Sequence, residues 1–271
     1  MCLVLFAYRS HPLYPLLLIA NRDEFYRRAS APAAPWPGEN LVAGRDLEGG
    51  GTWAGIARGR AAAVTNVREP GRPEPHLALS RGDIPRDFLT GESTPEDYAA
   101  GLDGPRYRGF NTLLFQLGAE RELVCAGNRH RPFTVEPGIH GISNGAPDAP
   151  WPKVRRGREG LAQLLRDAGE QIDERGFVLP ALALLRDDRP APAADLPHTG
   201  VSAALELALS PLFIHIEPED FAQASTADQP GGYGTRASTV IAVDHRGRSQ
   251  LWEQSYHRGR ANGPLRHFTL A

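Results

Sequence analysis

Cysteine is scarce in this sequence, and its scarcity narrows the class of protein. Among 271 residues there are two cysteines, Cys2 and Cys125, and neither belongs to a CxxC pair. Two isolated cysteines are too few for a disulfide framework. Cys125 lies in the apolar run 123–126, which predicts a buried core thiol, because free cysteine behaves as a small hydrophobic residue.

Lysine is almost absent. Lys153 is the only lysine, so nearly all of the 30 positively charged side chains are arginines. We interpret this first as coding bias. The basic residues form no dense block and the formal net charge is −2, so neither nucleic acid nor an anionic membrane is expected as a partner.

Long apolar runs are also missing. No run approaches the ~20 residues that a membrane-spanning helix needs, so no membrane span is expected. The N-terminal segment lacks a basic region, and Arg9, His11 and Pro12 interrupt its apolar stretches. This pattern argues against a secretory signal and favours the cytoplasm.

Several catalytic signatures do not occur. The nine histidines are scattered, with no HExxH and no His/Cys cluster at ligand spacing, so no metal site is expected. No GxSxG elbow supports a serine hydrolase. The glycine-rich segment 49–55 lacks the GKS or GKT ending of a phosphate loop, and close backbone packing explains it better. No cofactor is therefore required.

The composition that remains is that of a globular protein. Hydrophobic residues make up 41% of the chain and charged residues 23%, enough for a substantial core. No internal repeat or shift in composition divides the sequence. Residues 1–271 are predicted to form a single α+β domain in which strands from both ends of the chain share sheets and helices cover the faces.

Apolar periodicity and turn residues define the expected elements. Strands are predicted at 3–8, 16–20, 41–46, within 49–56, and at 61–67, 111–117, 122–126, 139–144, 213–216, 239–244 and 250–256. Helices are predicted at 80–89, 95–102, 154–167, 177–185 and 202–209, and loops rich in Ala and Pro at 29–40 and 187–197. Thr94, Pro95 and Asp97 form the N-terminal cap of the second helix.

The first two strands are expected to form a hairpin. In an antiparallel pair the first residue of one strand lies beside the last residues of the other. Cys2 would therefore lie opposite the segment 21–24.

Cys2 has two interpretations. If Met1 is removed, which a small second residue permits, Cys2 carries a thiol and a free α-amine with a pKa of about 7.7–8.0, so the amine can accept the thiol proton. The alternative is that Cys2 fills space in an edge strand. On position alone the second interpretation is favoured.

Polar residues follow several predicted strands, and they too have two interpretations. Asparagines at such positions often cap turns. Beside an N-terminal cysteine they also suit acyl transfer, because a thiolate that attacks a carbonyl needs donors for the developing oxyanion. The residues are Asn21, Arg22, Asp23, Asn66, Asn144 and Arg236.

Linked motifs in the same regions resemble the NRDE family, also called the transport-and-Golgi-organisation family. The resemblance extends from Met1 to about Tyr256. The motifs are Leu18-Ile19-Ala20-Asn21-Arg22-Asp23-Glu24, Gly51-Thr52-Trp53, Val64-Thr65-Asn66-Val67-Arg68, Ser143-Asn144-Gly145 and Tyr233-Gly234-Thr235-Arg236.

The resemblance implies a fold and a set of roles. The NRDE family is similar to N-terminal-nucleophile hydrolases, which are four-layer αββα sandwiches, and among them to cysteine amidases that act on bile salts and penicillin V. Cys2 falls on the nucleophile and Asp23 near the acid that orients its amine. Asn66 and Asn144 fall on the oxyanion or substrate-amide contacts, and Arg236 on an arginine that supports ionisation of the nucleophile.

One motif departs from the amidase pattern. Those amidases have Arg-Asn-x-Asp after the second strand, whereas this chain has Asn21-Arg22-Asp23-Glu24. The register of Arg22 on the pleat is therefore open. We expect Asn21, Arg22 and Trp53 to contact substrate.

Two functions follow from these expectations. The first is hydrolysis of a C–N amide bond in a small amphipathic substrate by Cys2. The second is a non-catalytic carrier of haem or a lipid on the same fold, which the family's association with haem handling and lipid metabolism suggests. A weaker third interpretation is a degenerate member whose polar strand ends only satisfy turns.

Overall fold

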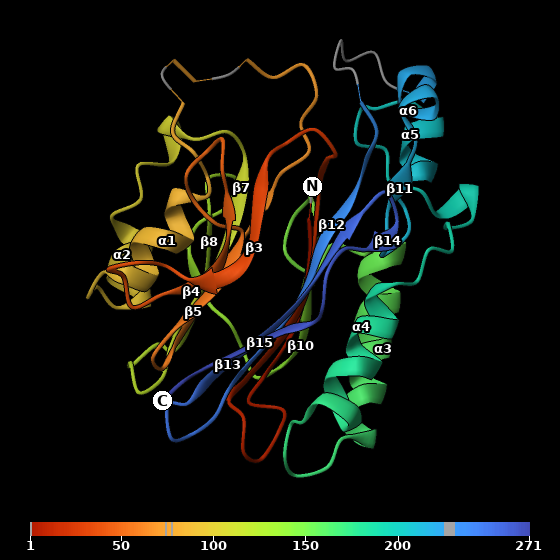
Figure 1. Ribbon diagram of the computed structural model, residues 1–271. Coiled ribbons are helices and arrows are strands. Elements are labelled where there is room, and N and C mark those ends of the chain that lie inside the picture. The colour runs from red at the N-terminus through yellow and green to blue at the C-terminus, as the bar shows by residue number, and fades with distance from the viewer. Residues whose placement is uncertain (1, 74, 77, 225–230) are drawn as a thin grey trace.

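The computed structural model describes residues 2–73, 75–76, 78–224 and 231–271. Met1 therefore lies outside the described residues. The fold is a mixed α+β structure with two antiparallel sheets (Figure 1).

The first sheet combines strands from the two ends of the chain, as the sequence predicts. Its main path runs β10-β1-β2-β12-β13-β14, with β11 paired to β12 and β15 paired to β13. The strands are β1 (Cys2–Tyr8), β2 (Leu16–Phe25), β10 (Gly138–Ile142), β11 (His215–Ile216), β12 (Tyr233–Val243), β13 (Ser249–His257), β14 (Arg260–Ala261) and β15 (Arg266–Leu270).

The second sheet is a meander in chain order, β3 to β9. Each strand pairs antiparallel with the next, and the connection between β6 and β7, residues 67–109, carries two helices. The strands are β3 (Ser30–Pro35), β4 (Val42–Asp46), β5 (Ala54–Ala57), β6 (Arg60–Asn66), β7 (Phe110–Gln116), β8 (Leu123–Gly127) and β9 (Phe133–Thr134).

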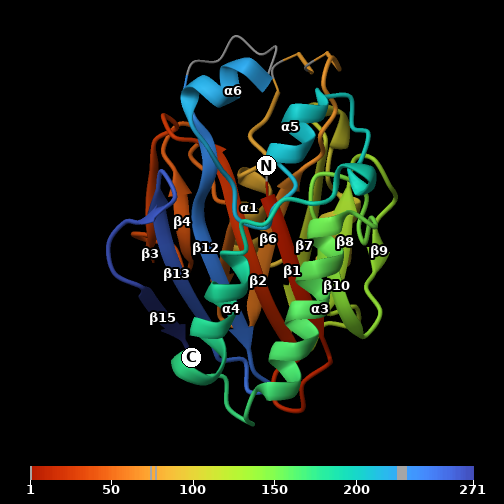
Figure 2. The same ribbon diagram turned by 90° about the vertical axis from the view of Figure 1, so that its right-hand side faces the viewer.

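Helices cover the outer face of each sheet (Figures 1 and 2). On the second sheet lie α1 (Asp83–Thr90) and α2 (Pro95–Ala100), whose Phe88, Leu89 and Ala99 pack on its strands. On the first sheet lie α3 (Pro152–Asp167) and α4 (Leu179–Leu185). Gly157 lets α3 approach closely, because a Cβ there would lie 2.4 Å from Leu5 Cδ1.

The remaining helical elements are short. They are α5 (Ala203–Ala208), α6 (Pro218–Ala224), the 3₁₀ turns η1 (Gly104–Arg106) and η3 (Ala193–Asp195), and the π turn η2 (Glu174–Val178). At the start of α2, the Thr94 side chain accepts a hydrogen bond from the Asp97 amide, as the predicted cap requires.

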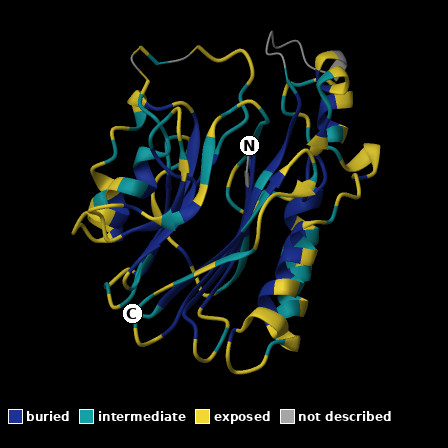
Figure 3. Cartoon of the chain, in the orientation of Figure 1, coloured by how far each residue is buried: buried dark blue, intermediate teal, exposed yellow. Residues whose placement is uncertain are grey.

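The main core lies between the two sheets. Val4, Phe6, Leu16 and Leu18 of the first sheet pack there against side chains of the second, such as Phe115. Figure 3 shows buried residues along the strands of both sheets and exposed residues on loops and outer helix surfaces. Because side chains alternate along a strand, Leu3, Leu5, Leu17 and Ile19 face the helices instead.

The predicted N-terminal hairpin is confirmed. Strands β1 and β2 pair antiparallel with Cys2 opposite Arg22, Leu3 opposite Asn21 and Val4 opposite Ala20. Figures 1 and 2 show that β1 begins toward the end of the molecule that carries α5 and α6.

The loop predicted at 29–40 is wrong in its first half, where β3 forms an edge strand. The proline content of this segment favoured a loop, but proline is tolerated in a strand at a sheet edge. The pairing with β4 is irregular between Ala31 and Ala34. Between them, the Ala33 amide donates a 2.6 Å hydrogen bond to the Glu253 carboxylate of the other sheet.

Candidate active site

The predicted polar residues begin at the end of β2. Arg22 follows Leu16, Leu18 and Ala20 on the face between the sheets, whereas Asn21 follows Leu17 and Ile19 on the helix face. The alternation resolves the open register of Arg22, which points toward the second sheet.

Arg22 is buried, with 5% of its side chain exposed, and its charge is compensated from the second sheet. Its Nη2 atom donates to Asp46 Oδ2 at 2.9 Å. The guanidinium carbon lies 4.5 Å from the centre of the Trp53 ring, a cation–π contact. Its Nη1 atom is buried without a hydrogen bond to any described residue, so it remains available to a ligand.

Asp46 is fixed from several directions and was not predicted from the sequence. Its Oδ1 accepts from the Gly49 amide at 2.9 Å, and its Oδ2 accepts from Arg28 Nε at 2.7 Å. Burial alone would raise the pKa of Asp46, but the hydrogen bonds from Arg28 and Gly49 and the charge of Arg22 hold it below its ordinary value. Asp46 therefore stays ionised and anchors Arg22.

Asp23 is 1% exposed and lies beside β12. The Thr235 hydroxyl donates to its Oδ1 at 2.7 Å, and the Tyr233 hydroxyl donates to its main-chain oxygen at 2.8 Å. Burial raises the pKa of Asp23 to about 6, while the charge of Lys153 acts in the opposite direction.

Lys153 is the second residue that sequence reasoning missed in this region. It lies in the first turn of α3, is 3% exposed, and donates from Nζ to the Leu209 main-chain oxygen at 3.1 Å. The sequence shows that Lys153 is the only lysine, but it does not show that this residue has a role. Its burial and its charge effect on Asp23 appear only in the structure.

Asn66 and Asn144 are brought together. Asn144 is 1% exposed and donates from Nδ2 to the main-chain oxygen of Asn66 at 2.8 Å. The side-chain amide of Asn66, at the end of β6, makes no hydrogen bond with any residue that the structure describes. Asn144 thus holds the backbone from which Asn66 projects.

Asn21 and Arg236 both donate hydrogen bonds to main-chain oxygens. Asn21 donates from Nδ2 to the Leu185 and Leu212 oxygens at 2.9 and 2.8 Å, and Ser238 donates to its Oδ1 at 2.6 Å. Arg236 lies at the β-bulge of β12.

The Arg236 guanidinium fixes the chain that follows β2. Its Nη1 donates to the oxygens of Phe25 and Tyr26 at 2.9 and 3.0 Å. Burial and the nearby charge of Arg22 lower its pKa.

A cavity of about 550 Å³ joins part of the predicted set. Arg22, Asp23, Trp53 and Asn66 line it. Arg22 and Trp53 also line a smaller cavity of about 80 Å³ together with Arg236. The described lining of the larger cavity includes apolar side chains, among them Phe25, Leu205 and Phe221.

Comparison with known proteins identifies the family. A family model described as Transport and Golgi organisation 2 matches residues 1–258. The chain belongs to this family. The resemblance inferred from the motifs is therefore confirmed.

Relatives in the family are similar over most of their length. The Transport and Golgi organization protein 2 homolog of Bos taurus is 33% identical over 270 residues, covering 94% of this chain and 93% of the relative. The homolog of Homo sapiens is 33% identical over 273 residues with the same coverage. The protein of Drosophila melanogaster is 29% identical over 276 residues, 94% of this chain and 92% of the relative.

Among solved structures, the chain is similar to a Caenorhabditis elegans N-acylethanolamine-hydrolyzing acid amidase ortholog. The TM-score is 0.42 and the sequence identity 12%, with 89% of this chain and 92% of that chain covered.

Two absences hold for the part of the chain that the structure describes. No helix there is long and apolar enough to cross a bilayer. No group of three His, Cys, Asp or Glu side chains in those residues has the arrangement of a metal site.

Proposed function

We propose that this protein is an N-terminal-nucleophile-type amidase. In this proposal Met1 is removed, and Cys2 attacks the C–N amide bond of a small amphipathic substrate. Two antiparallel sheets packed face to face with helices outside support the corresponding αββα fold.

The observation that carries the proposal is the register of the first hairpin. Cys2 pairs with Arg22, and Asp23 is the next residue along β2. Because the strands are antiparallel, the backbone nitrogen of Cys2 lies on the side of that residue toward the position opposite Asp23. A free α-amine at Cys2 would therefore lie beside a buried carboxylate, which can hold and orient it.

The reaction needs only this amine, the thiol and water. The α-amine accepts the thiol proton, and the sulfur forms a bond to the amide carbonyl carbon. The tetrahedral intermediate collapses with cleavage of the C–N bond, and the ammonium returns its proton to the departing nitrogen. Water then hydrolyses the thioester, releases the acid and regenerates the thiol.

Asparagine side chains support the oxyanion in this scheme. The Asn66 amide is the donor that faces the cavity without a described partner. Asn144 acts as a positioning residue through its hydrogen bond to the Asn66 main-chain oxygen. Loss of one such donor typically slows turnover about 10²–10³-fold.

Arginine charge supports ionisation of the nucleophile. A fixed cation close to a cysteine lowers its thiol pKa. Arg22 lies opposite Cys2, is buried, and has an Nη1 atom that makes no hydrogen bond to a described residue. Arg236 contributes through its charge, which lies near that of Arg22, and by fixing the main chain of Phe25 and Tyr26.

Labelling tests the nucleophile, with Cys125 as an internal control. The Cys125 thiol is buried, and burial raises its pKa to about 12. We expect iodoacetamide at pH 7.5 to modify Cys2 first, and Cys2→Ala to abolish amide hydrolysis while Cys125→Ala leaves it intact. Ligand binding without turnover in the unmodified protein, with haemin as one probe, would favour the carrier function instead.

A further inference from the structure

The smaller cavity beside the proposed active site, of about 80 Å³, has a wall made by both sheets. The first sheet contributes Arg22, Arg236 and Glu253, and the second contributes residues 30–32 at the start of β3 and Trp53, just before β5. Because a water molecule occupies about 30 Å³ in the liquid, the cavity has room for a small ion or a few waters. We call it the small cavity.

Three side chains of this wall have a buried N–H group that makes no hydrogen bond to a described residue. The atoms are Arg22 Nη1, Trp53 Nε1 and Arg236 Nε. All three are donors, and no buried side-chain acceptor of the described wall lacks a partner. Buried polar groups are nearly always satisfied in folded proteins, so these donors require an acceptor in the cavity.

An anion satisfies such a set of donors better than water does. Each water that accepts a hydrogen bond also has two O–H groups of its own, which need acceptors. The acid of the wall, Glu253, already accepts from the Ala33 amide and the Thr239 hydroxyl at 2.6 and 3.4 Å. A halide or a carboxylate only accepts, so it matches a wall in which the groups without a partner are all donors.

The three donors lie close together in the fold. The Arg22 guanidinium carbon is 4.5 Å from the centre of the Trp53 ring. Arg22 pairs with Ala237 across strands β2 and β12, and Arg236 is the bulge residue just before Ala237. One small ion can therefore contact more than one of these side chains.

Other contacts hold each donor in place. Arg22 donates from Nη2 to Asp46 at 2.9 Å, and Arg236 donates from Nη1 to two main-chain oxygens at 2.9 and 3.0 Å. The Trp53 ring lies against β4 so closely that a Cβ at Gly44 would overlap it. The donors are thus fixed before any ion binds, which lowers the ordering cost of binding.

Arg236 brings positive charge that no ion pair with a described residue offsets. Its Nη1 hydrogen bonds go to main-chain oxygens. Burial and the nearby charge of Arg22 lower the pKa of Arg236, and the charge of Glu24 acts in the opposite direction. Burial raises the pKa of Glu253 to about 7, so below that pH Glu253 adds little negative charge to the cavity. An anion in the small cavity would supply it.

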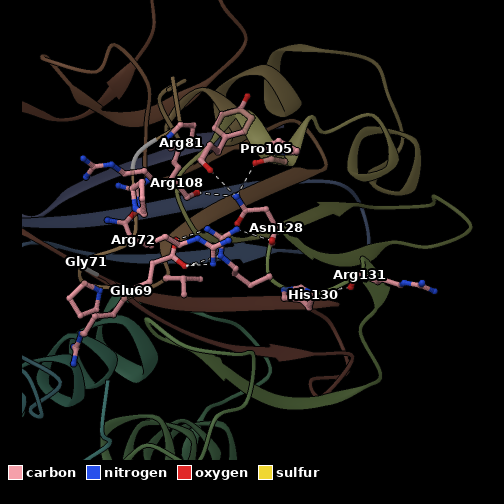
Figure 4. Close-up of a pocket in the computed structure, with 18 of the residues that line it drawn as sticks. Glu69, Gly71, Arg72, Arg81, Pro105, Arg108, Asn128, His130 and Arg131 are labelled. Carbon is pink, nitrogen blue, oxygen red and sulfur yellow. Dashed lines mark hydrogen bonds and ion pairs between the residues drawn. The ribbon is translucent and has the colours of Figure 1, made fainter. Parts of the chain in front are cut away.

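The larger cavity nearby, of about 1140 Å³, provides a contrast (Figure 4). Arginines are also frequent in its wall, but Glu69 accepts from Arg129 Nε and Nη2 at 2.8 and 2.6 Å and from Arg72 Nη1 at 3.2 Å. No side-chain atom of the described residues in that wall is buried without a hydrogen-bond partner. Buried donors without partners therefore distinguish the small cavity from it.

We propose that the small cavity is an anion site, in which one halide ion or one carboxylate group is held by Arg22, Trp53 and Arg236. The exposed residue Asn262 also lines the cavity, which places the site within reach of solvent. The site depends only on these side chains and does not require that Cys2 be a nucleophile.

The linewidth of the ³⁵Cl NMR signal tests the site directly, because chloride bound to a protein has a broader signal than free chloride. The protein is titrated with chloride at about pH 6, below the pKa of Glu253. Sodium gluconate keeps the ionic strength constant, so that screening does not change. We expect an excess linewidth that saturates with chloride. Formate, a small carboxylate, should remove it, and the formate concentration required shows whether a halide or a carboxylate binds more tightly.

Matched variants then locate the site. Trp53→Phe removes one donor and keeps a ring beside Arg22, and we expect it to weaken chloride binding about tenfold. Trp36→Phe is the control, because Trp36 also has an arginine, Arg45, 4.6 Å from its ring centre, but its Nε1 donates to the Ala43 oxygen at 3.0 Å. Trp36→Phe should leave chloride binding unchanged. Arg22→Met should remove the saturable signal.

Thermal unfolding midpoints confirm that each variant is folded. If the wild-type protein shows no saturable linewidth, or if Arg22→Met keeps all of it, the anion site is overturned. An equal loss in Trp36→Phe and Trp53→Phe would also overturn it, because the loss would not depend on the donor without a partner. A saturable signal that Trp53→Phe weakens and Trp36→Phe does not supports the site, even in a protein that hydrolyses no amide.

Discussion

The Thr235 hydroxyl donates a 2.7 Å hydrogen bond to Asp23 Oδ1 in a site where Asp23 is 1% exposed. Burial raises the pKa of Asp23 to about 6, and this hydrogen bond and the charge of Lys153 both act against that rise. Asp23 is therefore an acid whose ionisation near neutral pH depends on its immediate neighbours.

Asp23 should make folding stability depend on pH. Its folded pKa of about 6 lies above its ordinary value of 3.8, so its contribution to stability is present below about pH 4 and is lost as pH rises through 6. The difference corresponds to roughly 3 kcal/mol. We expect Asp23→Asn to gain stability relative to wild type between pH 4 and 7 in urea unfolding. A constant difference across that range would contradict the assignment.

Lys153→Met should destabilise the fold more at pH 8 than at pH 5. Above the pKa of Asp23 the carboxylate is charged and loses the favourable charge of Lys153, a loss of roughly 1–3 kcal/mol. Below that pKa the carboxyl is neutral. Urea unfolding of Lys153→Met and of Arg166→Met, an exposed arginine on the same helix, provides the comparison. An equal loss at both pH values would show that Lys153 acts by packing alone.

Arg22 should control the reactivity of Cys2. Replacing it with Met removes the buried cation opposite Cys2, which raises the thiol pKa. We expect the pH profile of iodoacetamide labelling at Cys2 to move to higher pH by about one unit. Arg22→Lys keeps the charge and should retain most of the wild-type profile. If Arg22→Met and Arg22→Lys gave the same profile as wild type, the guanidinium would have no electrostatic role.

Burial of Glu253 should make folding stability depend on pH. Its carboxylate accepts a 2.6 Å hydrogen bond from the Ala33 amide of β3 and a 3.4 Å hydrogen bond from the Thr239 hydroxyl. Burial raises the pKa of Glu253 to about 7. Its contribution is present below about pH 4.5 and is lost as pH rises through 7. Glu253→Gln keeps the acceptor and should reduce this dependence in urea unfolding between pH 5 and 8. An unchanged slope would contradict the prediction.

Local sequence signals located much of the fold. The β1–β2 hairpin and the Thr94 cap depend on residues close together in the chain, and both were predicted correctly. The β3 strand was missed because its hydrogen-bond partners, β4 and the Glu253 carboxylate, are not visible in its proline-rich sequence.

In the site, too, local motifs indicated some residues, whereas contacts distant in sequence determine others. The motifs indicated Arg22, Asp23, Asn66 and Asn144, and strand register and contacts bring them near one another. Asp46 and Lys153 act through contacts with residues distant in sequence, and no local pattern marks them. Asn21 and Arg22 are neighbours on a strand, so their side chains point to opposite faces of the sheet.

The central claim is that residue 2 is the first residue of the mature protein and its nucleophile. Intact mass spectrometry of the purified protein, before and after brief treatment with iodoacetamide at pH 7.5, tests it directly. The account predicts a mass that lacks Met1 and a single carbamidomethyl group, mapped to Cys2. Retention of Met1, or modification of Cys125 as fast as Cys2, would contradict it.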